Sequence, residues 1–261
     1  MFEEIQMTKP IDSEYCHTLH RQRRELLALL RTTELTCLKQ GIHHQQIIPE
    51  ASYSPWKGDQ QFLRLYELAR NNTLVDIYRC YELWALVLRT NSLRGSVAEI
   101  GVWRGGTAAI LAAASKQANA EQPIHLFDTF SGVVKASEDQ DTLYRGGEHA
   151  DTSESVVVEL MTRLQLNNFQ IHSGVFPDNT GLTLPKHIRC CHVDVDTYGS
   201  AKSCMDFVWP RITIGGVLVF DDYGFWGCEG VTELLDKESP DNSLLIHNLN
   251  GHGILVKISS D

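Results

Sequence analysis

Residues 97–114 read V-A-E-I-G-V-W-R-G-G-T-A-A-I-L-A-A-A, and this stretch decides the fold. A short apolar run, 97–102, is followed by a glycine-rich turn and then by an alanine-rich segment that favours a helix. Glycine suits the turn because it lacks a Cβ atom, so the chain can bend tightly and a ligand can approach its backbone. A strand, a glycine turn and a helix in this order predict a βαβ unit with a parallel sheet.

Short apolar runs alternate with helical stretches through the rest of the chain, as expected for an α/β fold. We expect seven strands, at residues 97–102, 124–127, 170–174, 189–193, 216–220, 244–249 and 253–258. Helices are expected to begin near Thr107, Ser153, Ser200 and Gly230. Residues 250–252 are too few for a crossover helix, so the last two strands should form an antiparallel hairpin beside a mostly parallel sheet.

The N-terminal part has a helical pattern instead. Leucines fall mostly on one face of residues 12–40, which predicts a helix that ends at Gly41. Residues 41–60 are broken by proline and glycine and predict a loop. A second helical region follows at about 60–89, interrupted near residues 71 and 72. We therefore expect an N-terminal helical extension, 1–90, which either covers the site as a lid or completes the core, and an α/β domain, 91–261.

The composition excludes several classes of function. The formal net charge of the 261-residue chain is -10, which disfavours nucleic acid because Lys and Arg contacts to phosphate dominate such binding. No apolar run is long enough to span a bilayer, and residues 1–10 lack the apolar segment of a secretory signal. Seven cysteines without the spacing of secreted proteins predict free thiols. We expect a cytoplasmic protein that binds neither nucleic acid nor membrane.

Acidic residues stand at the ends of the expected strands: Glu99, Asp128, Asp194, Asp196, Asp221 and Asp222. Ligands of open α/β sheets bind outside the carboxyl ends of the strands, so these side chains should converge on one crevice. Crowded carboxylates repel one another and resist ionisation. A cationic ligand or a metal ion would relieve that repulsion, although any single Asp at a strand end can instead cap a loop or helix.

The glycine turn is compatible with several nucleotide ligands. Gly101 and Gly106 have the spacing of a phosphate-binding loop, but Thr107 replaces its lysine, and the dinucleotide fingerprint G-x-G-x-x-G is absent. S-adenosylmethionine (SAM) has cationic sulfonium and amino groups and two ribose hydroxyls, which Glu99 and Asp128 could contact. Because glycine turns occur in many α/β proteins, the turn by itself favours a nucleoside-type cofactor only modestly.

The later acidic pairs favour a metal ion. Asp194 and Asp196 are two residues apart, so both would point to one face of a continuing strand. Asp221 and Asp222 can converge only if the chain turns, and Tyr223-Gly224 favours a turn. Carboxylates without nearby His or Cys ligands suit Mg²⁺. The residues of 190–192, Cys-Cys-His, alternate faces on a strand and are expected in the core rather than on one ion.

Four segments carry a family resemblance: V-A-E-I-G-V-W-R-G-G-T-A, H-L-F-D-T-F-S-G, H-V-D-V-D-T-Y and G-G-V-L-V-F-D-D-Y-G-F, with T-L-V-D upstream at 73–76. Together they resemble the macrocin O-methyltransferase family, whose members are class I, SAM- and Mg²⁺-dependent enzymes that methylate sugar hydroxyls of macrolides and of the aminocoumarin novobiocin. The resemblance covers about residue 60 to the C-terminus. It implies a Rossmann-like methyltransferase in which residues 91–261 form the catalytic domain.

The resemblance also implies roles for individual residues. It implies SAM contacts from Glu99, Gly101, Val102, Trp103, Gly106, Thr107 and Asp128, and Mg²⁺ ligation by Asp194, Asp221 and Asp222. Asp196 matches a position proposed as the general base, and His149 is a second candidate in a long polar loop, 131–152, of the kind that often covers an active site. The acceptor would be a small hydroxylated, glycosylated molecule, and the protein a homo-oligomer.

Three other functions compete with this interpretation. A methyltransferase acting on a phenolic or catechol hydroxyl would use the same metal chemistry. A hydrolase or phosphoryl-transfer enzyme would need a phosphate cradle, which the missing lysine argues against. A nucleoside-binding module without catalysis would have no need of the paired aspartates.

Overall fold

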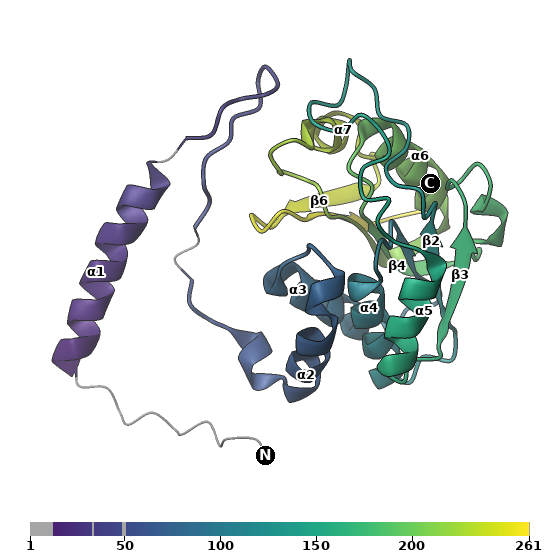
Figure 1. Cartoon of the computed structure of the whole chain (residues 1–261), viewed down its shortest axis with the longest axis horizontal. Coiled ribbons are helices and arrows are strands. Elements are labelled where there is room, and N and C mark those ends of the chain that lie inside the picture. Colours follow the sequence, from purple (N-terminus) through teal and green to yellow (C-terminus); the bar gives the residue numbers. More distant parts are fainter. Residues whose placement is uncertain (1–12, 33, 49–50, 261) are drawn as a thin grey trace. The chain divides into compact units, whose positions relative to one another are not determined.

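The computed structural model describes residues 13–32, 34–48 and 51–260 (Figure 1). The chain divides into two compact units, Met1–Ser52 and Tyr53–Asp261. In the described part of the first unit, helix α1 spans Ser13–Arg31 and an isolated β-bridge joins Glu34 to Gln45. The expectation of a helix up to residue 40 was wrong: the Thr32 hydroxyl donates a hydrogen bond to the Leu29 carbonyl (2.7 Å) at the helix end. Residue 12 lies outside the described residues.

The second unit is built on a seven-stranded sheet with the order β3-β2-β1-β4-β5-β7-β6. Its strands are β1 (Ser96–Ile100), β2 (Ile124–Asp128), β3 (Phe169–Ser173), β4 (Ile188–Val193), β5 (Ile212–Phe220), β6 (Ser243–His247) and β7 (Gly253–Lys257). Strands β1 to β5 pair in parallel, whereas β7 pairs antiparallel with both β5 and β6. The expected seven strands and the C-terminal hairpin are thus confirmed.

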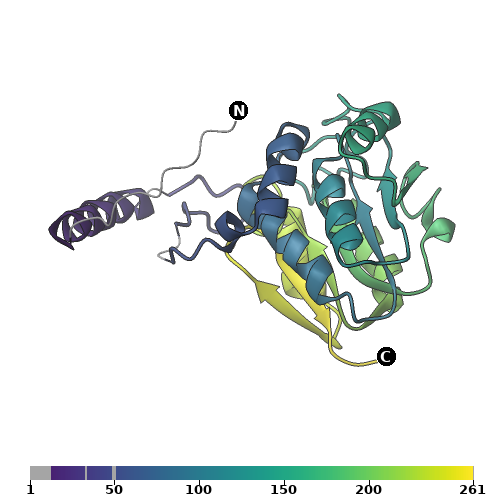
Figure 2. The ribbon, with the colours of Figure 1, turned by 90° about the horizontal axis from the view of Figure 1, so that it is seen from below.

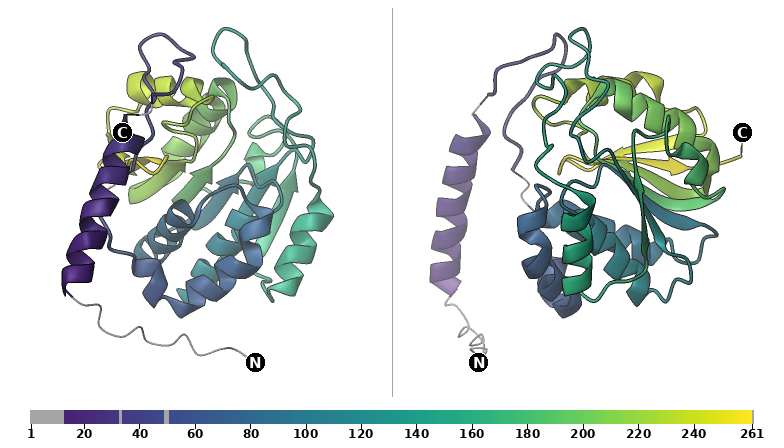
Figure 3. Two further views of the ribbon diagram at one scale, coloured as in Figure 1. Left: turned by 60° about the vertical axis from the view of Figure 1, so that its left-hand side comes forward. Right: turned by 45° about the vertical axis from the view of Figure 1, so that its right-hand side comes forward.

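Helices cover both faces of this sheet, as the right-hand view of Figure 3 shows. One face carries α2 (Gln60–Ala69), α3 (Ile77–Arg89), α4 (Gly106–Gln117) and α5 (Glu154–Arg163), of which α2, α3 and α4 lie side by side in Figure 2. The other face carries α6 (Tyr198–Val208) and α7 (Glu229–Glu238). Short 3-10 turns complete the unit: η1 (Pro55–Gly58), η2 (Arg70–Asn72), η3 (Gly181–Thr183) and η4 (Trp209–Arg211).

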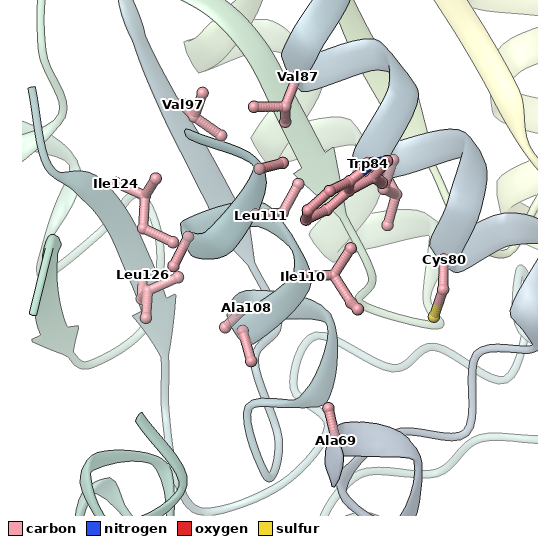
Figure 4. Packing of buried hydrophobic residues seen from close by; sticks show 14 of the residues in the cluster. Ala69, Cys80, Trp84, Val87, Val97, Ala108, Ile110, Leu111, Ile124 and Leu126 are labelled. Atoms are coloured by element: carbon pink, nitrogen blue, oxygen red, sulfur yellow. The ribbon is translucent and has the colours of Figure 1, made fainter. Parts of the chain in front are cut away.

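The two hydrophobic cores follow from strand alternation. Val97 and Cys190 lie in the core on the α4 face, whereas Ala98 and Cys191 lie in the core on the α6 face. Figure 4 shows part of the first core, in which Ile110 and Leu111 of α4 lie near Trp84 of α3. Because neighbouring strand residues point to opposite faces, Cys190 and Cys191 do not meet. The six cysteines whose side chains the structure describes are all free thiols, as expected.

The helical region at 60–89 is interrupted, as expected, and the break positions α3. Helix α2 ends at Ala69, and Asp76 caps α3 by accepting hydrogen bonds from the backbone N–H groups of Tyr78 (2.8 Å) and Arg79 (3.1 Å). Both helices belong to the same compact unit as the sheet and pack against α4. The boundary at residue 90 and the lid role of residues 1–90 stay predictions. None of the helices in the described part of the chain has the length and hydropathy that crossing a membrane requires.

Candidate functional site

A pocket of about 260 Å³ opens at the carboxyl ends of β1, β2, β4 and β5. The order of strands reverses between β1 and β4, and this is the place where open α/β sheets bind their ligands. The wall includes every residue predicted for the site except Glu99 and Gly106. It also includes residues 72–75 before α3 and residues of the loop 131–152, in which the described structure has no helix or strand.

The turn after β1 is held by Asp128 at the end of β2. One carboxylate oxygen of Asp128 accepts hydrogen bonds from the backbone N–H groups of Val102 (2.6 Å) and Trp103 (2.8 Å). The other accepts from the N–H of Phe130 (2.7 Å). These bonds fix the carboxylate against the glycine turn, so Asp128 both shapes the pocket wall and presents oxygen atoms to it.

Gly101 is needed for a reason that the sequence did not show. Its φ is +87°, and a Cβ atom there would lie 1.7 Å from the carbonyl oxygen of Asp194. The turn after β1 therefore touches the segment after β4, and glycine permits this contact rather than the approach of a ligand alone.

Glu99 and Gly106 support the pocket from behind. Glu99 is fully buried, and its carboxylate contacts Nδ1 of His192 at 2.8 Å, so the histidine is paired in the core as expected. Burial alone would lower the pKa of His192, but its acidic neighbours Asp221 and Glu99 raise it to about 10. A Cβ atom on Gly106 would lie 2.7 Å from the backbone of Asn72, so this glycine lets α4 pack against the break between α2 and α3.

The four aspartates after β4 and β5 converge. One carboxylate oxygen each from Asp194, Asp221 and Asp222 lie within 4.8 Å of one another, and Asp196 and Asp222 form a similar group with Cys228. Strand β5 ends at Phe220, and the expected turn at 221–224 is present. The argument from strand alternation was wrong for Asp194 and Asp196, because β4 ends at Val193 and Asp196 has a φ of +63°.

These aspartates differ in their electrostatic surroundings. Burial, followed by the charges of neighbouring aspartates, raises the pKa values of Asp194 and Asp196 well above the usual range, and raises that of Asp222 to about 6. Burial would also raise the pKa of Asp221, but contacts with His192 and His252 and the charge of Arg79 hold it well below its usual value. Asp221 is therefore the aspartate of the cluster whose negative charge is balanced by the side chains around it.

Both base candidates, Asp196 and His149, line the pocket. The ring of His149 lies between those of Trp103 and Tyr144, with centroid distances of 6.2 Å and 5.9 Å. Tyr144 donates a hydrogen bond to Asp196. The loop that carries His149 and Tyr144 is closed at its neck, where the N–H of Val133 donates to the Glu148 carbonyl at 2.8 Å.

The sequence did not single out three pocket residues: Arg79, Tyr144 and Cys228. Arg79 ion-pairs with Asp221, and Cys228 contacts Oδ1 of Asp222 at 3.6 Å. The sequence did contain a signal for the position of Arg79. The T-L-V-D segment at 73–76 ends on Asp76, which caps α3, and Arg79 lies in the first turn of that helix.

The donor set is suited to a hard divalent cation. Asp194, Asp221 and Asp222 offer oxygen atoms, and Mg²⁺ is bound in proteins by few carboxylates together with water or substrate oxygens. Burial, and then the mutual repulsion of the aspartates, raises the pKa values of Asp194 and Asp222, so a bound cation would favour their charged forms.

The sheet order, its antiparallel end and the pocket at the reversal of strand order define the class I methyltransferase fold. The O-methyltransferase NovP has this fold, with a TM-score of 0.64 at 20% identity over 72% of this chain and 83% of NovP. Calicheamicin methyltransferase CalS11 follows with a TM-score of 0.58 at 17% identity over 79% of this chain and 94% of CalS11. The chain belongs to the macrocin-O-methyltransferase (TylF) family, whose profile matches residues 71–239.

Two curated relatives are O-methyltransferases by name. Mycinamicin III 3''-O-methyltransferase of Micromonospora griseorubida is 28% identical over 155 residues, 55% of this chain and 61% of the relative. Demethyldecarbamoylnovobiocin O-methyltransferase of Streptomyces niveus is 24% identical over 51% of this chain and 54% of the relative. The matches thus span between half and two thirds of these relatives' length.

Proposed function

We propose that this protein is a SAM- and Mg²⁺-dependent O-methyltransferase that methylates a hydroxyl group of a small molecule, in particular a sugar of a natural product. Membership of the macrocin-O-methyltransferase family and the names of the curated relatives support this activity. The observation that carries the proposal is the convergence of Asp194, Asp221 and Asp222 in the same pocket as the glycine turn. A binding module without catalysis would have no use for this second group of residues.

The half of the pocket formed by β1 and β2 would hold SAM, which supplies an electrophilic methyl group. The wall there consists of Gly101, Val102, Trp103, Thr107 and Asp128. Glu99 and Gly106 would act indirectly in this proposal, by fixing the turn. Because backbone N–H groups already orient Asp128, its carboxylate needs no rearrangement to accept further hydrogen bonds from a ribose.

The half formed by β4 and β5 would hold Mg²⁺ through Asp194, Asp221 and Asp222. A bound Mg²⁺ lowers the pKa of a coordinated hydroxyl and orients it. The chain contributes a buried, crowded set of carboxylates, whose mutual repulsion a cation relieves.

A general base then removes the proton from the acceptor hydroxyl. Asp196 is the first candidate, because it lines the pocket beside the cluster and receives a hydrogen bond from Tyr144. His149 lines the same pocket and is the second candidate. Base catalysis of this kind contributes about 10²–10⁴-fold to the rate.

The decisive experiment has two stages. Calorimetry measures SAM binding to the purified protein with and without Mg²⁺, and mass spectrometry then follows transfer of one methyl group to glycosylated macrolides and aminocoumarins and to a simple catechol. Methylation of a sugar hydroxyl supports the proposal, and methylation of the catechol alone would favour the phenolic alternative. Absence of SAM binding would refute it. A cytoplasmic location and a homo-oligomeric state stay predictions, the second open to light scattering.

A further inference from the structure

Arg79 lies on the acidic cluster, where it contacts Asp221 together with the buried His192. Among the described residues that line the pocket, it is the sole Lys or Arg. Its Nη1 atom pairs with Oδ2 of Asp221, and the two side chains are 6% and 7% exposed. An ion pair this deeply buried is held in a medium of low dielectric constant, where charges act strongly on one another.

The position of Arg79 is fixed from two further sides. Its Nε donates to Oδ2 of Asp76, the residue that caps α3, at 2.9 Å. Its guanidinium lies 4.4 Å from the ring centre of Phe225, which follows β5. Arg79 thus bridges the start of α3 to the segment that carries Asp221 and Asp222.

Asp221 has both carboxylate oxygens engaged by the chain. Oδ2 contacts Arg79, and Oδ1 lies 3.0 Å from Nε2 of His252, whose other ring nitrogen contacts Glu82. A divalent cation shared by Asp194, Asp221 and Asp222 would have to share Asp221 with a guanidinium that is already bound to it. Two cations on one carboxylate repel, so Arg79 and the metal ion must compete.

We propose that Arg79 is the resident counter-cation of the cluster: it partly neutralises Asp221 and thereby weakens and tunes the binding of the divalent cation. The inference rests on the metal site of the proposed function and deepens it. Arg79 is a positioning residue here, because it acts through Asp221. A site without this charge would bind metal more tightly.

The test measures Mn²⁺ binding by calorimetry and by electron paramagnetic resonance, with no methyl transfer involved. In Arg79→Met the side chain keeps a similar length and its contact with Phe225 but loses the charge, so the dissociation constant for Mn²⁺ should fall at least about tenfold. Arg79→Lys keeps a charge but carries all its N–H donors on one nitrogen, so it cannot bridge Asp76 and Asp221 as Nε and Nη1 do, and it should bind Mn²⁺ about two- to threefold more tightly than the unmodified protein. Arg89→Met, an exposed arginine on the same helix, should leave the affinity unchanged.

The outcomes separate the two proposals. If the unmodified protein binds no Mn²⁺, the metal site fails and this inference falls with it. If it binds Mn²⁺ but Arg79→Met binds equally or more weakly, the inference alone is overturned, because Arg79 would then only hold Asp221 in place. Thermal unfolding of each variant in EDTA verifies folding. If Arg79→Met is insoluble, the Arg79→Lys variant provides the test. Unchanged or weaker Mn²⁺ binding by Arg79→Lys would contradict the competition between Arg79 and the metal ion.

Discussion

The two halves of the pocket treat negative charge in opposite ways. In the half formed by β1 and β2, Asp128 accepts backbone N–H groups on both carboxylate oxygens. In the half formed by β4 and β5, burial and neighbouring acids raise the pKa values of Asp194, Asp196 and Asp222. In the first half the backbone supplies hydrogen-bond donors to the carboxylate that lines the pocket, whereas in the second half burial and mutual repulsion disfavour the charged forms of Asp194, Asp196 and Asp222. This difference supports the proposal that the second half binds a cation.

The largest expected effect comes from removing that cation. In EDTA, or with Asp222→Asn, turnover should fall by at least about 10³-fold, because metal-assisted activation and orientation of the hydroxyl are lost together. SAM affinity measured by calorimetry should change by less than about threefold, since the first half is intact. Full activity in EDTA would mean that the second half of the pocket needs no cation, which would contradict the contrast between the two halves.

The next effect tests the base. Asp196→Asn should lower kcat by about 10²–10⁴-fold and leave SAM binding unchanged, because it removes proton abstraction without touching the glycine turn. His149→Gln is the matched substitution in the loop 131–152 and should cost less than tenfold. The reverse ranking in single-turnover kinetics would move the role of base to His149.

A third effect lies in stability rather than activity. Asp221→Asn removes the buried charge that Arg79 contacts and leaves this arginine with Asp76 alone, so urea unfolding in EDTA should show a loss of about 3–5 kcal/mol. Asp194→Asn removes a carboxylate that its neighbours repel, so stability should stay equal or rise by about 1 kcal/mol. Equal losses in the two variants would mean that Asp221 is no better compensated than Asp194.

The smallest effect isolates a pH dependence outside the pocket. Nδ1 of His125 lies 3.2 Å from Nε2 of His172, and burial together with this neighbour lowers the pKa of His125 from 6.5 to about 4. Between these values the unfolded chain binds a proton that the folded protein does not, so stability should fall as the pH falls from 6.5 to 4, by up to about 3 kcal/mol.

His125→Gln should remove this part of the acid destabilisation, whereas His187→Gln, at an exposed histidine, should not. Urea unfolding at pH 7 and pH 4.5 measures both variants. If both variants lose the same stability between pH 7 and pH 4.5, the acid destabilisation comes from other groups, including the carboxylates of the pocket.

The sheet could be predicted from the sequence because alternation and strand ends are local signals. The brevity of residues 250–252 was enough to predict the antiparallel hairpin that β6 and β7 form. The end of α1 was missed because Leu35 and Leu38, after Arg31, continue the helical pattern although both side chains are exposed. Hydrophobic periodicity cannot distinguish a buried face from an exposed one.

The site was predictable as a set of residues but not as a set of contacts. The position of each Asp after its strand predicted the convergence on one pocket. The pairing of Glu99 with His192, and of Arg79 with Asp221, joins residues 93 and 142 positions apart in the chain. Such contacts depend on the strand order and on how α3 packs, which no local pattern encodes.

Because Gly101 lies against the Asp194 carbonyl, a substitution at this one position would affect both halves of the pocket. A methyl group at residue 101 would force apart the two loops that we propose to bind SAM and Mg²⁺, so Gly101→Ala should weaken the binding of both in the same protein. Directed evolution toward new acceptors would therefore find no tolerated substitutions at this junction, and variation would concentrate on the outer rim, at residues such as Leu74 and Trp226.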